Sequence, residues 1–560
     1  MNSKNSHPTT VGEYLLARLC TLGTKHIFGI PGDYVLRFNQ LIEQHPHIQF
    51  INTTRENSAG FSANAYAHLK GLGVACVTYG VGIEIISALA QAYIENYPLV
   101  IISGAIAERE YKKNKKCHHL MNKVATEHGD CTQLEIFKNL TIDHGLLHFP
   151  STAAAVIDRV LHSCLEHKKP VYFELPRDMV DQPLLHLPTI SSTSTSSTTP
   201  IPDLDKVLNE TQRILSNCHY PLIWAGHEIL RFNLNSPLLR FAEKYNIPLV
   251  SSLLGKTVID EHHPLFIGVY QGEMSSDKTL ETVKKCDCLL IAGVIFNDID
   301  TGIFTTKLDH KHQIVVNHDS LTIDHHHYSL SLVDYINGLN NLTISQSFSL
   351  PYASRHETVI KKFSAVSETK TTMKRVFECL QTHLTSEHIV VSDVGDSLFA
   401  SSDLVLAQNS FLSNPYFTSI GTGIPTAIGA QFADPSRRVV AIVGDGGFQM
   451  SAMELSTAVR YHLDPIVIVL NNHGYGTERV LLEGDFNDIV NWNYTQIPLV
   501  LGGGVGIKVA TEEAFQQALE KAFSQRNTFY IIEVDLDKTD FSPSLTRLGE
   551  TLGKIVKSEN

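Results

Sequence analysis

The chain has 560 residues, enough for roughly three to four domains that each bury a hydrophobic core. Hydrophobic residues make up 43% of it, and 58 acidic against 45 basic side chains give a net charge of −13. This composition is typical of a large globular enzyme. It excludes a general nucleic-acid binder, which needs a basic surface to neutralise phosphates.

No apolar stretch reaches the length of a transmembrane helix, since the runs 74–86 and 98–106 are short and interrupted by small or polar residues. Residues 1–8 lack the apolar core of a secretion signal. The nine cysteines show no C-x-x-C spacing, so neither a zinc site nor a disulfide framework is expected. We therefore expect a cytoplasmic protein without membrane or nucleic-acid partners.

Apolar runs typical of buried strands alternate with helical segments in the first block of the chain, residues 1–190. The strands are expected at 26–28, 74–78, 99–102 and 170–174. The block ends at a serine- and threonine-rich run, 191–200, which has nothing to bury and is typical of a linker.

The second block, residues 201–345, repeats the pattern, and its strands are expected at 221–224, 248–250, 288–291 and 313–316. Polar residues at 340–355 predict a second linker, and the third block covers 356–560. The repeated alternation of strand and helix predicts an α/β fold of three domains. Each is expected to be a doubly wound, mostly parallel sheet with helices on both faces.

The most informative motif follows two expected strands of the third block, 438–443 and 465–470. Asp445 lies in a Gly-Asp-Gly-Gly turn after the first strand, and Asn472 and Gly474 follow the second. Parallel strands end at one edge of a sheet, where ligands bind, so these residues are expected to lie close together. Carboxylate, amide and carbonyl oxygens suit Mg2+, which commonly takes phosphates as further ligands.

The glycines of this turn allow close approach of a ligand to the backbone. A helix expected to begin near Ser451 would present its amide groups to an anion. The motif therefore predicts a site for a diphosphate group and Mg2+.

Polar residues of the first block also follow strand and helix ends. Asp33 ends a Gly-Ile-Pro-Gly-Asp turn, Glu56 precedes a helix of small residues, and His118 and His119 are adjacent in a loop. Taken singly, each has an ordinary structural explanation as a turn residue, a first-turn acid or a surface histidine.

Together these motifs resemble a known family. Gly-Asp-Gly followed by Asn-Asn and Gly-Tyr-x-x-Glu resembles the thiamine diphosphate motif of the pyruvate decarboxylase family. Gly-Asp-Tyr at Asp33, the acid at Glu56 and the pair His118-His119 resemble the decarboxylase branch of thiamine diphosphate enzymes. Similar segments extend through nearly the whole chain, at 79–82, 255–270, 301–302, 395–397, 418–421 and 486–492.

The resemblance implies a pyrimidine-binding domain, a middle domain and a diphosphate-binding domain. The implied reaction is the non-oxidative decarboxylation of a 2-oxo acid to an aldehyde and CO2. Thiamine diphosphate and Mg2+ would lie between the first domain of one subunit and the third domain of its neighbour. A homodimer is then the minimal active unit, and a homotetramer is expected.

The resemblance also assigns residues to roles. The implied Mg2+ ligands are Asp445, Asn472 and Gly474, and the implied catalytic residues are Asp33, Glu56, His118, His119 and Glu478. The implied cofactor-binding residues are Glu56, Asp396, Thr418, Ser419, Ile420, Gly446, Gly447 and Asn472. Glu56, shielded from water and facing ring nitrogen N1′, is expected to have a raised pKa, so that it can share a proton with the ring.

Three residues differ from those of pyruvate-specific relatives. Leu398 replaces a tryptophan, Thr477 replaces isoleucine or valine, and Gly476 replaces threonine. Smaller side chains would leave more volume in the pocket, where a matched methylene contributes about 1 to 3 kcal/mol. A branched-chain or aromatic 2-oxo acid is therefore expected as the substrate in preference to pyruvate.

Two alternatives remain open. A carboligase of the acetohydroxyacid synthase type shares the cofactor and fold, although such enzymes generally lack the adjacent histidines. A non-catalytic, cofactor-binding homologue would be expected to lose at least one of the five polar active-site residues, and all five are present. The run 325–327 contains three histidines that cannot all face one ion, so a solvated cluster is expected there.

Overall fold

The computed structural model describes residues 9–111, 113, 115–126, 129–185, 203–308, 312–348 and 363–550. Backbone contacts divide the chain into two compact units. The first comprises Met1–Ser196, Ile424–Pro435 and Met453–Leu463; the second comprises Ser197–Gly423, Ser436–Ala452 and Asp464–Asn560. The predicted domain limits stay predictions, since positions 190, 201 and 356 lie outside the described ranges.

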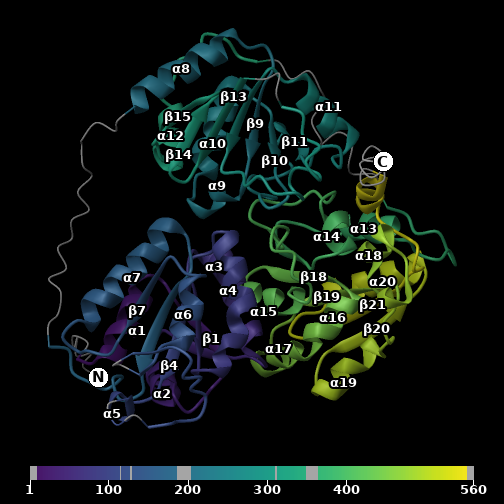
Figure 1. The fold of residues 1–560 in the computed structure, drawn as a ribbon. Coiled ribbons are helices and arrows are strands. Elements are labelled where there is room, and N and C mark those ends of the chain that lie inside the picture. Colours follow the sequence, from purple (N-terminus) through teal and green to yellow (C-terminus); the bar gives the residue numbers. More distant parts are fainter. Residues whose placement is uncertain are drawn as a thin grey trace, which may run out of the picture. The chain divides into compact units, whose positions relative to one another are not determined.

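The first unit is built on a six-stranded parallel sheet (Figure 1). Its strand order is β2 (Gln49–Asn52), β1 (His26–Gly29), β3 (Gly73–Val77), β4 (Leu99–Ala105), β8 (Val171–Pro176) and β7 (Asp143–Leu146). The four strands predicted from apolar runs are all present, whereas β2 and β7 were not predicted. These two are the edge strands and are less apolar, which explains the weaker signal.

Successive residues of these strands point into two different cores. Ile27 packs in one core and Phe28 in the other, and Val74 and Ala75 divide in the same way. The first core includes side chains of α1 (Val11–Thr21), α2 (Leu36–Gln44) and α7 (Ala153–His167). The second includes those of α3 (Glu56–Lys70), α4 (Ile86–Ile94) and α6 (Thr132–Lys138). Helices therefore cover both faces of the sheet.

The middle part of the second unit has a seven-stranded sheet in the order β11, β10, β9, β12, β13, β14, β15. Five strands are parallel: β11 (Phe266–Val269), β10 (Leu249–Ser251), β9 (Pro221–Ala225), β12 (Cys288–Ala292) and β13 (His312–Asn317). Its helices are α8 (Leu204–Asn217), α9 (His227–Arg231), α10 (Asn235–Tyr245), α11 (Asp277–Lys285) and α12 (Leu332–Leu339). The four predicted strands of this block are present, and β11 was not predicted.

An antiparallel hairpin, β14 (Ser320–Ile323) and β15 (His326–Tyr328), extends this sheet and was also not predicted. The three histidines at 325–327 lie at this hairpin and are exposed. Their exposure agrees with the solvated cluster expected there.

The predicted second linker is only partly a linker. Leu342, Ile344 and Phe348 are buried in the core of the middle part, and the Phe348 amide donates to the Tyr245 carbonyl oxygen at 2.9 Å. Residues 340–348 therefore belong to the packed structure, because their spaced apolar side chains reach the core despite the polar residues between them. The remaining residues, 349–355, and the first linker, 191–200, lie outside the described residues.

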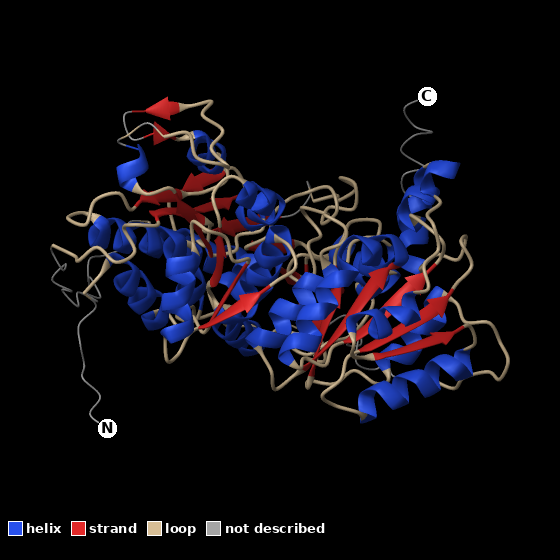
Figure 2. Cartoon of the chain, turned by 90° about the horizontal axis from the view of Figure 1, so that it is seen from below, coloured by secondary structure: helices blue, strands red, loops and turns tan. Residues whose placement is uncertain are grey.

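A second six-stranded parallel sheet completes the second unit. Figure 2 draws the strands of the chain in red and its helices in blue. Its order is β17 (Phe411–Leu412), β16 (His388–Ser392), β18 (Arg438–Gly444), β19 (Ile466–Asn471), β21 (Tyr530–Asp535) and β20 (Val505–Val509). Strands β18 and β19 are neighbours in register, with Gly444 opposite Leu470. The residues that follow these two strands therefore leave the sheet at the same edge.

The helices that accompany this sheet include α13 (Met373–Gln381), α14 (Asp396–Ser401), α16 (Asp445–Ser451), α18 (Gly476–Leu481), α19 (Ile497–Leu501) and α20 (Glu512–Ser524). Two further helices, α15 (Gly423–Ala433) and α17 (Leu455–Tyr461), fall almost wholly in the first unit. The fold class is thus confirmed: two sheets are wholly parallel and one is mostly parallel, with interleaved helices. Within the described residues, no helix is both long enough and apolar enough to cross a bilayer.

Candidate active site

A cavity of about 430 Å³ lies beyond the carboxyl ends of the strands of the C-terminal sheet. This volume is in the range of roughly 300 to 1,000 Å³ that is usual for ligand pockets. Most of its wall comes from the ends of β16, β18 and β19 and the turns that follow them. Six of the residues predicted to bind the cofactor line this cavity: Asp396, Thr418, Ile420, Gly446, Gly447 and Asn472. Asp445, Gly474 and Glu478 line it as well.

The three predicted Mg2+ ligands meet in this wall. Asp445 is almost fully buried, and its carboxylate accepts hydrogen bonds from the Gly446 amide at 2.8 Å and the Gly474 amide at 3.0 Å. Burial raises the pKa of Asp445 to about 6, against the lowering effect of these amide groups. A cation beside the carboxylate would oppose the effect of burial, so the set of Asp445, Asn472 and Gly474 fits a hard metal ion.

Two glycines allow close packing of the turn at the same place. A Cβ atom on Gly446 would lie 2.6 Å from the ring of Tyr475, and one on Gly447 would lie 2.6 Å from Oδ2 of Asp393. Any side chain at these positions would therefore displace part of the wall. The turn is therefore tightly packed against Tyr475 and Asp393, and the close approach of a ligand to its backbone stays a prediction.

The predicted start of the following helix was wrong. Helix α16 begins at Asp445 and ends at Ser451, so the motif itself forms the first turn of the helix. The glycines at 446 and 447 masked this in the sequence because glycine is a poor helix former. Ser451 is therefore the last residue of the helix and not its start.

Asp393 was missed by the sequence analysis although it organises the site. It is buried at the end of β16, and it accepts hydrogen bonds from the amides of Val394 at 2.8 Å and Gly421 at 3.0 Å. Burial raises its pKa to about 6. The carboxylate thereby holds the turn that contains Thr418 and Ile420 next to the end of β16. Its place directly after a buried strand was the available signal.

The predicted cofactor-binding segment 418–420 lies in this turn. Thr418 has a left-handed backbone, with φ of 55°, and its amide donates to the Asn414 carbonyl oxygen at 2.8 Å. Thr418 and Ile420 line the cavity, whereas Ser419 is not among the lining residues. The Ser419 carbonyl oxygen instead accepts a hydrogen bond from the Asn414 side chain at 3.0 Å.

Asp396 lines the cavity, but its carboxylate is already engaged. The Ser542 amide donates to it at 2.8 Å, and the Ser542 hydroxyl donates to it as well. Burial raises the pKa of Asp396 to about 6. Asp396 therefore anchors the segment at Ser542 to the cavity wall, a contact that sequence spacing could not reveal.

The residues proposed to shape the substrate pocket do not all lie in it. Thr477 and Gly476 line the cavity beside the exposed Glu478. Leu398, by contrast, is 1% exposed and packs in the hydrophobic core of the domain, outside the cavity lining. The size argument from Leu398 is therefore wrong, because α14 turns this side chain toward the sheet. The argument from Thr477 and Gly476 stays a prediction.

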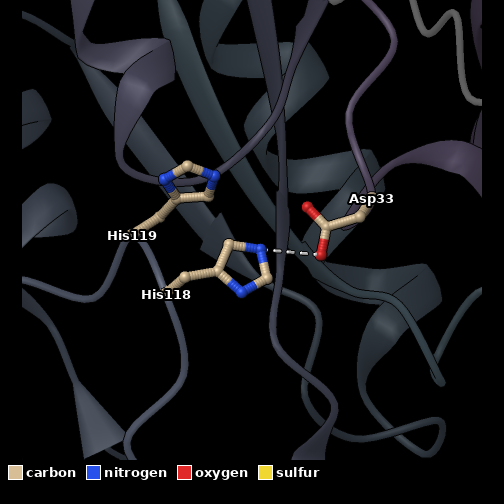
Figure 3. Close-up of side chains that lie close together, drawn as sticks. All are labelled: Asp33, His118 and His119. Atoms are coloured by element: carbon tan, nitrogen blue, oxygen red, sulfur yellow. Dashed lines mark ion pairs between the residues drawn. The ribbon is translucent and has the colours of Figure 1, made fainter.

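Three predicted catalytic residues meet in the first unit, as Figure 3 shows. Nε2 of His118 lies 3.0 Å from Oδ2 of Asp33, and the rings of His118 and His119 are 4.6 Å apart. Tyr34 stacks on His118 and donates its hydroxyl to the His118 carbonyl oxygen at 2.8 Å. A carboxylate and two imidazoles in contact form a group suited to moving protons.

Glu56 is the first residue of α3, as predicted, and its side chain is half-buried. Burial raises the pKa of its carboxyl group, and the neighbouring Glu84 raises it further. The direction agrees with the raised pKa expected of a carboxyl group that shares a proton with a ring nitrogen. Glu56 belongs to the first unit, and the cavity belongs to the second.

Comparison with known families identifies the class of protein. Residues 393–534 match the C-terminal TPP binding domain of the thiamine pyrophosphate enzymes, 9–128 match their N-terminal TPP binding domain, and 208–339 match their central domain. Each match falls within one of the three parts of the chain that carry the sheets described above. The chain belongs to the thiamine pyrophosphate enzyme family.

Several relatives are similar to this chain over nearly its whole length. The chain is 30% identical to an alpha-keto-acid decarboxylase of Mycobacterium tuberculosis (strain H37Rv) over 558 residues, which cover 98% of this chain and 97% of the relative. It is 30% identical over 547 residues to the alpha-keto-acid decarboxylase of Mycolicibacterium paratuberculosis, covering 96% of each chain. The corresponding protein of Mycobacterium ulcerans is 28% identical over 551 residues, covering 96% of this chain and 95% of the relative.

Proposed function

We propose that this protein is a thiamine diphosphate- and Mg2+-dependent decarboxylase that converts a 2-oxo acid to an aldehyde and CO2. The observation that carries this proposal is the group formed by Asp33, His118 and His119, because a chain that only bound the cofactor would not need it. Its relatives are alpha-keto-acid decarboxylases, which supports the same reaction.

Bound thiamine diphosphate supplies the nucleophilic carbon that adds to the 2-oxo acid and the ring that takes up electrons as CO2 leaves. In this chain Asp445, Asn472 and Gly474 would hold Mg2+ against the diphosphate group. Thr418 would accept a hydrogen bond through its carbonyl oxygen, and Ile420 would support the rings with its apolar side chain. These residues line one cavity, so they can act on one bound molecule.

Glu56 would hold a proton at ring nitrogen N1′. Burial raises the pKa of Glu56, so its carboxyl group holds a proton more readily than an ordinary exposed glutamate does. Asp33, His118, His119 and Glu478 would form the polar wall beside the substrate carboxylate and pass a proton to the reacting carbon. Imidazoles suit this task, since they gain and lose protons near neutral pH.

We propose that the active site is shared between subunits, as the resemblance to the pyruvate decarboxylase family implies. The proposed minimal active unit is a homodimer in which the first domain of one chain serves the third domain of the other. We further propose a branched-chain or aromatic 2-oxo acid as the preferred substrate, on the strength of Thr477 and Gly476 in the cavity wall.

The test is the release of CO2 from a panel of 2-oxo acids, with and without thiamine diphosphate and Mg2+. A decarboxylase releases one aldehyde for each CO2, whereas a carboligase incubated with pyruvate yields acetolactate in place of acetaldehyde. Release of CO2 that depends on both cofactors, with stoichiometric aldehyde, is the expected result. No turnover of any member of the panel by protein loaded with cofactor would overturn the proposal.

A further inference from the structure

The segment that carries His118 and His119 has an unusual backbone. His119 and Asn122 have left-handed conformations, with φ of 67° and 52°, although neither is glycine. Such residues cost of the order of 1 to 3 kcal/mol each and persist where the surrounding structure holds them. Contacts with the surrounding structure must therefore hold the backbone of this segment in place.

Asp130 holds the segment from its carboxyl-terminal side. It is 3% exposed, and its Oδ2 accepts a hydrogen bond from the Met121 amide, two residues after His119, at 2.9 Å. Its Oδ1 accepts from the Thr132 amide at 3.0 Å. The Thr132 hydroxyl oxygen in turn accepts from the amides of Lys123 at 3.0 Å and Val124 at 2.9 Å. Three amides of the segment thus depend on Asp130 and its neighbour.

Gln133 acts on the other side of His119, through Gly80. Its Oε1 accepts a hydrogen bond from the Gly80 amide at 2.6 Å, and the side chain is fully buried. Gly80 has φ of +77°, and a Cβ atom there would lie 2.5 Å from the carbonyl oxygen of His119. The backbone of His119 therefore rests directly on Gly80, whose position Gln133 sets. Nε2 of Gln133 donates to Ser103 at 2.8 Å and Tyr172 at 2.9 Å, which fix its orientation.

Tyr79 connects the contacts made by Asp130 with the contact between Gln133 and Gly80. It precedes Gly80 in the chain, and its hydroxyl donates to the Asp130 carbonyl oxygen at 3.0 Å. Burial raises the pKa of Tyr79, so the hydroxyl stays a neutral donor in the working pH range. The three residues form one buried hydrogen-bonded support beneath an exposed pair of histidines.

We propose that Asp130 and Gln133 are positioning residues for His118 and His119: together they set the backbone of the histidine segment against Asp33. This proposal rests on the proposed function, in which both histidines handle protons at the substrate. A displacement of about 1 Å is enough to cost roughly 100-fold in a positioned reaction, so loss of either support should be measurable in the histidine-dependent step.

The experiment compares Asp130→Asn, Asp130→Ala and Gln133→Met in the full-length protein loaded with thiamine diphosphate and Mg2+. Gln133→Met keeps the shape but removes the acceptor for Gly80, and Asp130→Asn keeps one oxygen acceptor where alanine keeps none. The matched control is Glu95→Gln, which alters another buried carboxyl of the same unit, one that accepts from Gln91 on α4. Hydrogen exchange of the peptide 115–124 is measured in parallel by mass spectrometry.

We expect kcat to fall by about 10-fold or more for Asp130→Ala and Gln133→Met, less for Asp130→Asn, and KM to change by less than about 2-fold. Exchange of the cofactor C2 proton should stay within about 2-fold of the parent, because it depends on Glu56 and not on the histidines. Single-turnover ratios of CO2 to aldehyde should change in the same direction as in His119→Ala. Exchange of the 115–124 amides should increase, and Glu95→Gln should show none of these effects.

Three results would overturn the proposal: an unchanged ratio of CO2 to aldehyde, unchanged exchange in 115–124, or a loss of C2 proton exchange as large as the loss of kcat. The last result would mean general damage to the cofactor site. If the parent itself decarboxylates no 2-oxo acid, the proposed function fails. Hydrogen exchange would still show whether Asp130 and Gln133 hold the histidine segment.

Discussion

Oδ2 of Asp445 accepts a hydrogen bond from the Gly474 amide at 3.0 Å, which ties the end of strand β18 to the turn after strand β19. Asp445, Asn472 and Gly474 all line the same cavity. The two strands are 22 residues apart in the chain, from Gly444 to Ile466, but neighbours in the sheet. The candidate metal site therefore depends on the parallel pairing of β18 with β19.

We expect Asp445→Ala to lose thiamine diphosphate and Mg2+ while the chain stays folded. Removal of a carboxylate ligand should lower the affinity for Mg2+ by at least about 10-fold, because the cation loses its charged protein ligand. Cofactor content after gel filtration measures the effect, and Asp319→Ala, an exposed acid in the middle part, is the control. Normal cofactor content in Asp445→Ala would remove Asp445 from the metal site.

Glu56→Gln should still bind the cofactor but lose most of its turnover, by about 100-fold or more. An amide cannot exchange a proton with the ring nitrogen, whereas a carboxyl group with a raised pKa can. The rate of C2 proton exchange, followed by quenched-flow NMR, should fall with kcat. An exchange rate equal to that of the parent would show that Glu56 is not the activating acid.

Glu478→Gln should leave C2 proton exchange nearly intact and slow a later step. Glu478 lines the cavity at the start of α18, and it is assigned to the substrate side of the cofactor. Single-turnover measurements should therefore show a slower release of CO2 or of aldehyde, with a fall in kcat of roughly 100-fold. If both products appeared at the parent rate, Glu478 would lie outside the reacting group.

Thr477→Ile should shift the ratio of kcat/KM toward pyruvate and away from 4-methyl-2-oxopentanoate or phenylpyruvate, by about 10-fold. The larger side chain would take up volume that a branched substrate needs, since Thr477 lines the cavity. Leu398→Trp is the informative contrast, because Leu398 packs in the core and a larger residue there should destabilise the protein instead of changing its specificity. A parent that prefers pyruvate to every larger acid would refute the substrate proposal.

His26 should make the stability of the first unit sensitive to acid. Its ring packs against Tyr66 and Phe432, at 5.5 and 5.0 Å between centroids, and its buried Nδ1 has no hydrogen-bond partner among the described residues. Burial lowers the pKa of His26 to about 4, below the value of about 6.5 expected in the unfolded chain. The unfolded state therefore takes up the proton first, and stability is lost as the pH falls from about 6.5 to about 4.

The variant His26→Phe should reduce this loss, because phenylalanine keeps the ring contacts and cannot be protonated. The midpoint of denaturation by urea, measured between pH 7.5 and 4.5, should fall less steeply than in the parent. His162→Gln serves as the control, since that histidine side chain is 77% exposed. Parallel pH dependences of His26→Phe and the parent would show that His26 does not contribute.

Much of the fold was predictable because buried parallel strands carry a strong local signal. Strands such as β4, β12, β18 and β19 are continuous apolar runs, buried at every described position or nearly so. Edge strands β2 and β7 and the hairpin of β14 and β15 were missed, since each has exposed or only partly buried positions and mixed composition. Apolar runs in a sequence indicate buried strands, so strands that are only partly buried have a weaker apolar pattern and are harder to predict.

The sequence by itself determined the family, the fold class and the residues at the strand ends, because these depend on short motifs and local periodicity. Only the tertiary structure decided which other residues hold these strand-end residues in place through hydrogen bonds. Asp393 beneath the turn at Thr418 and Ser542 on Asp396 are contacts between distant parts of the chain. The tertiary structure also moved Leu398 from the proposed pocket into the core. Such choices depend on how whole elements pack, since a helix turned by one residue directs its side chain to a different neighbour.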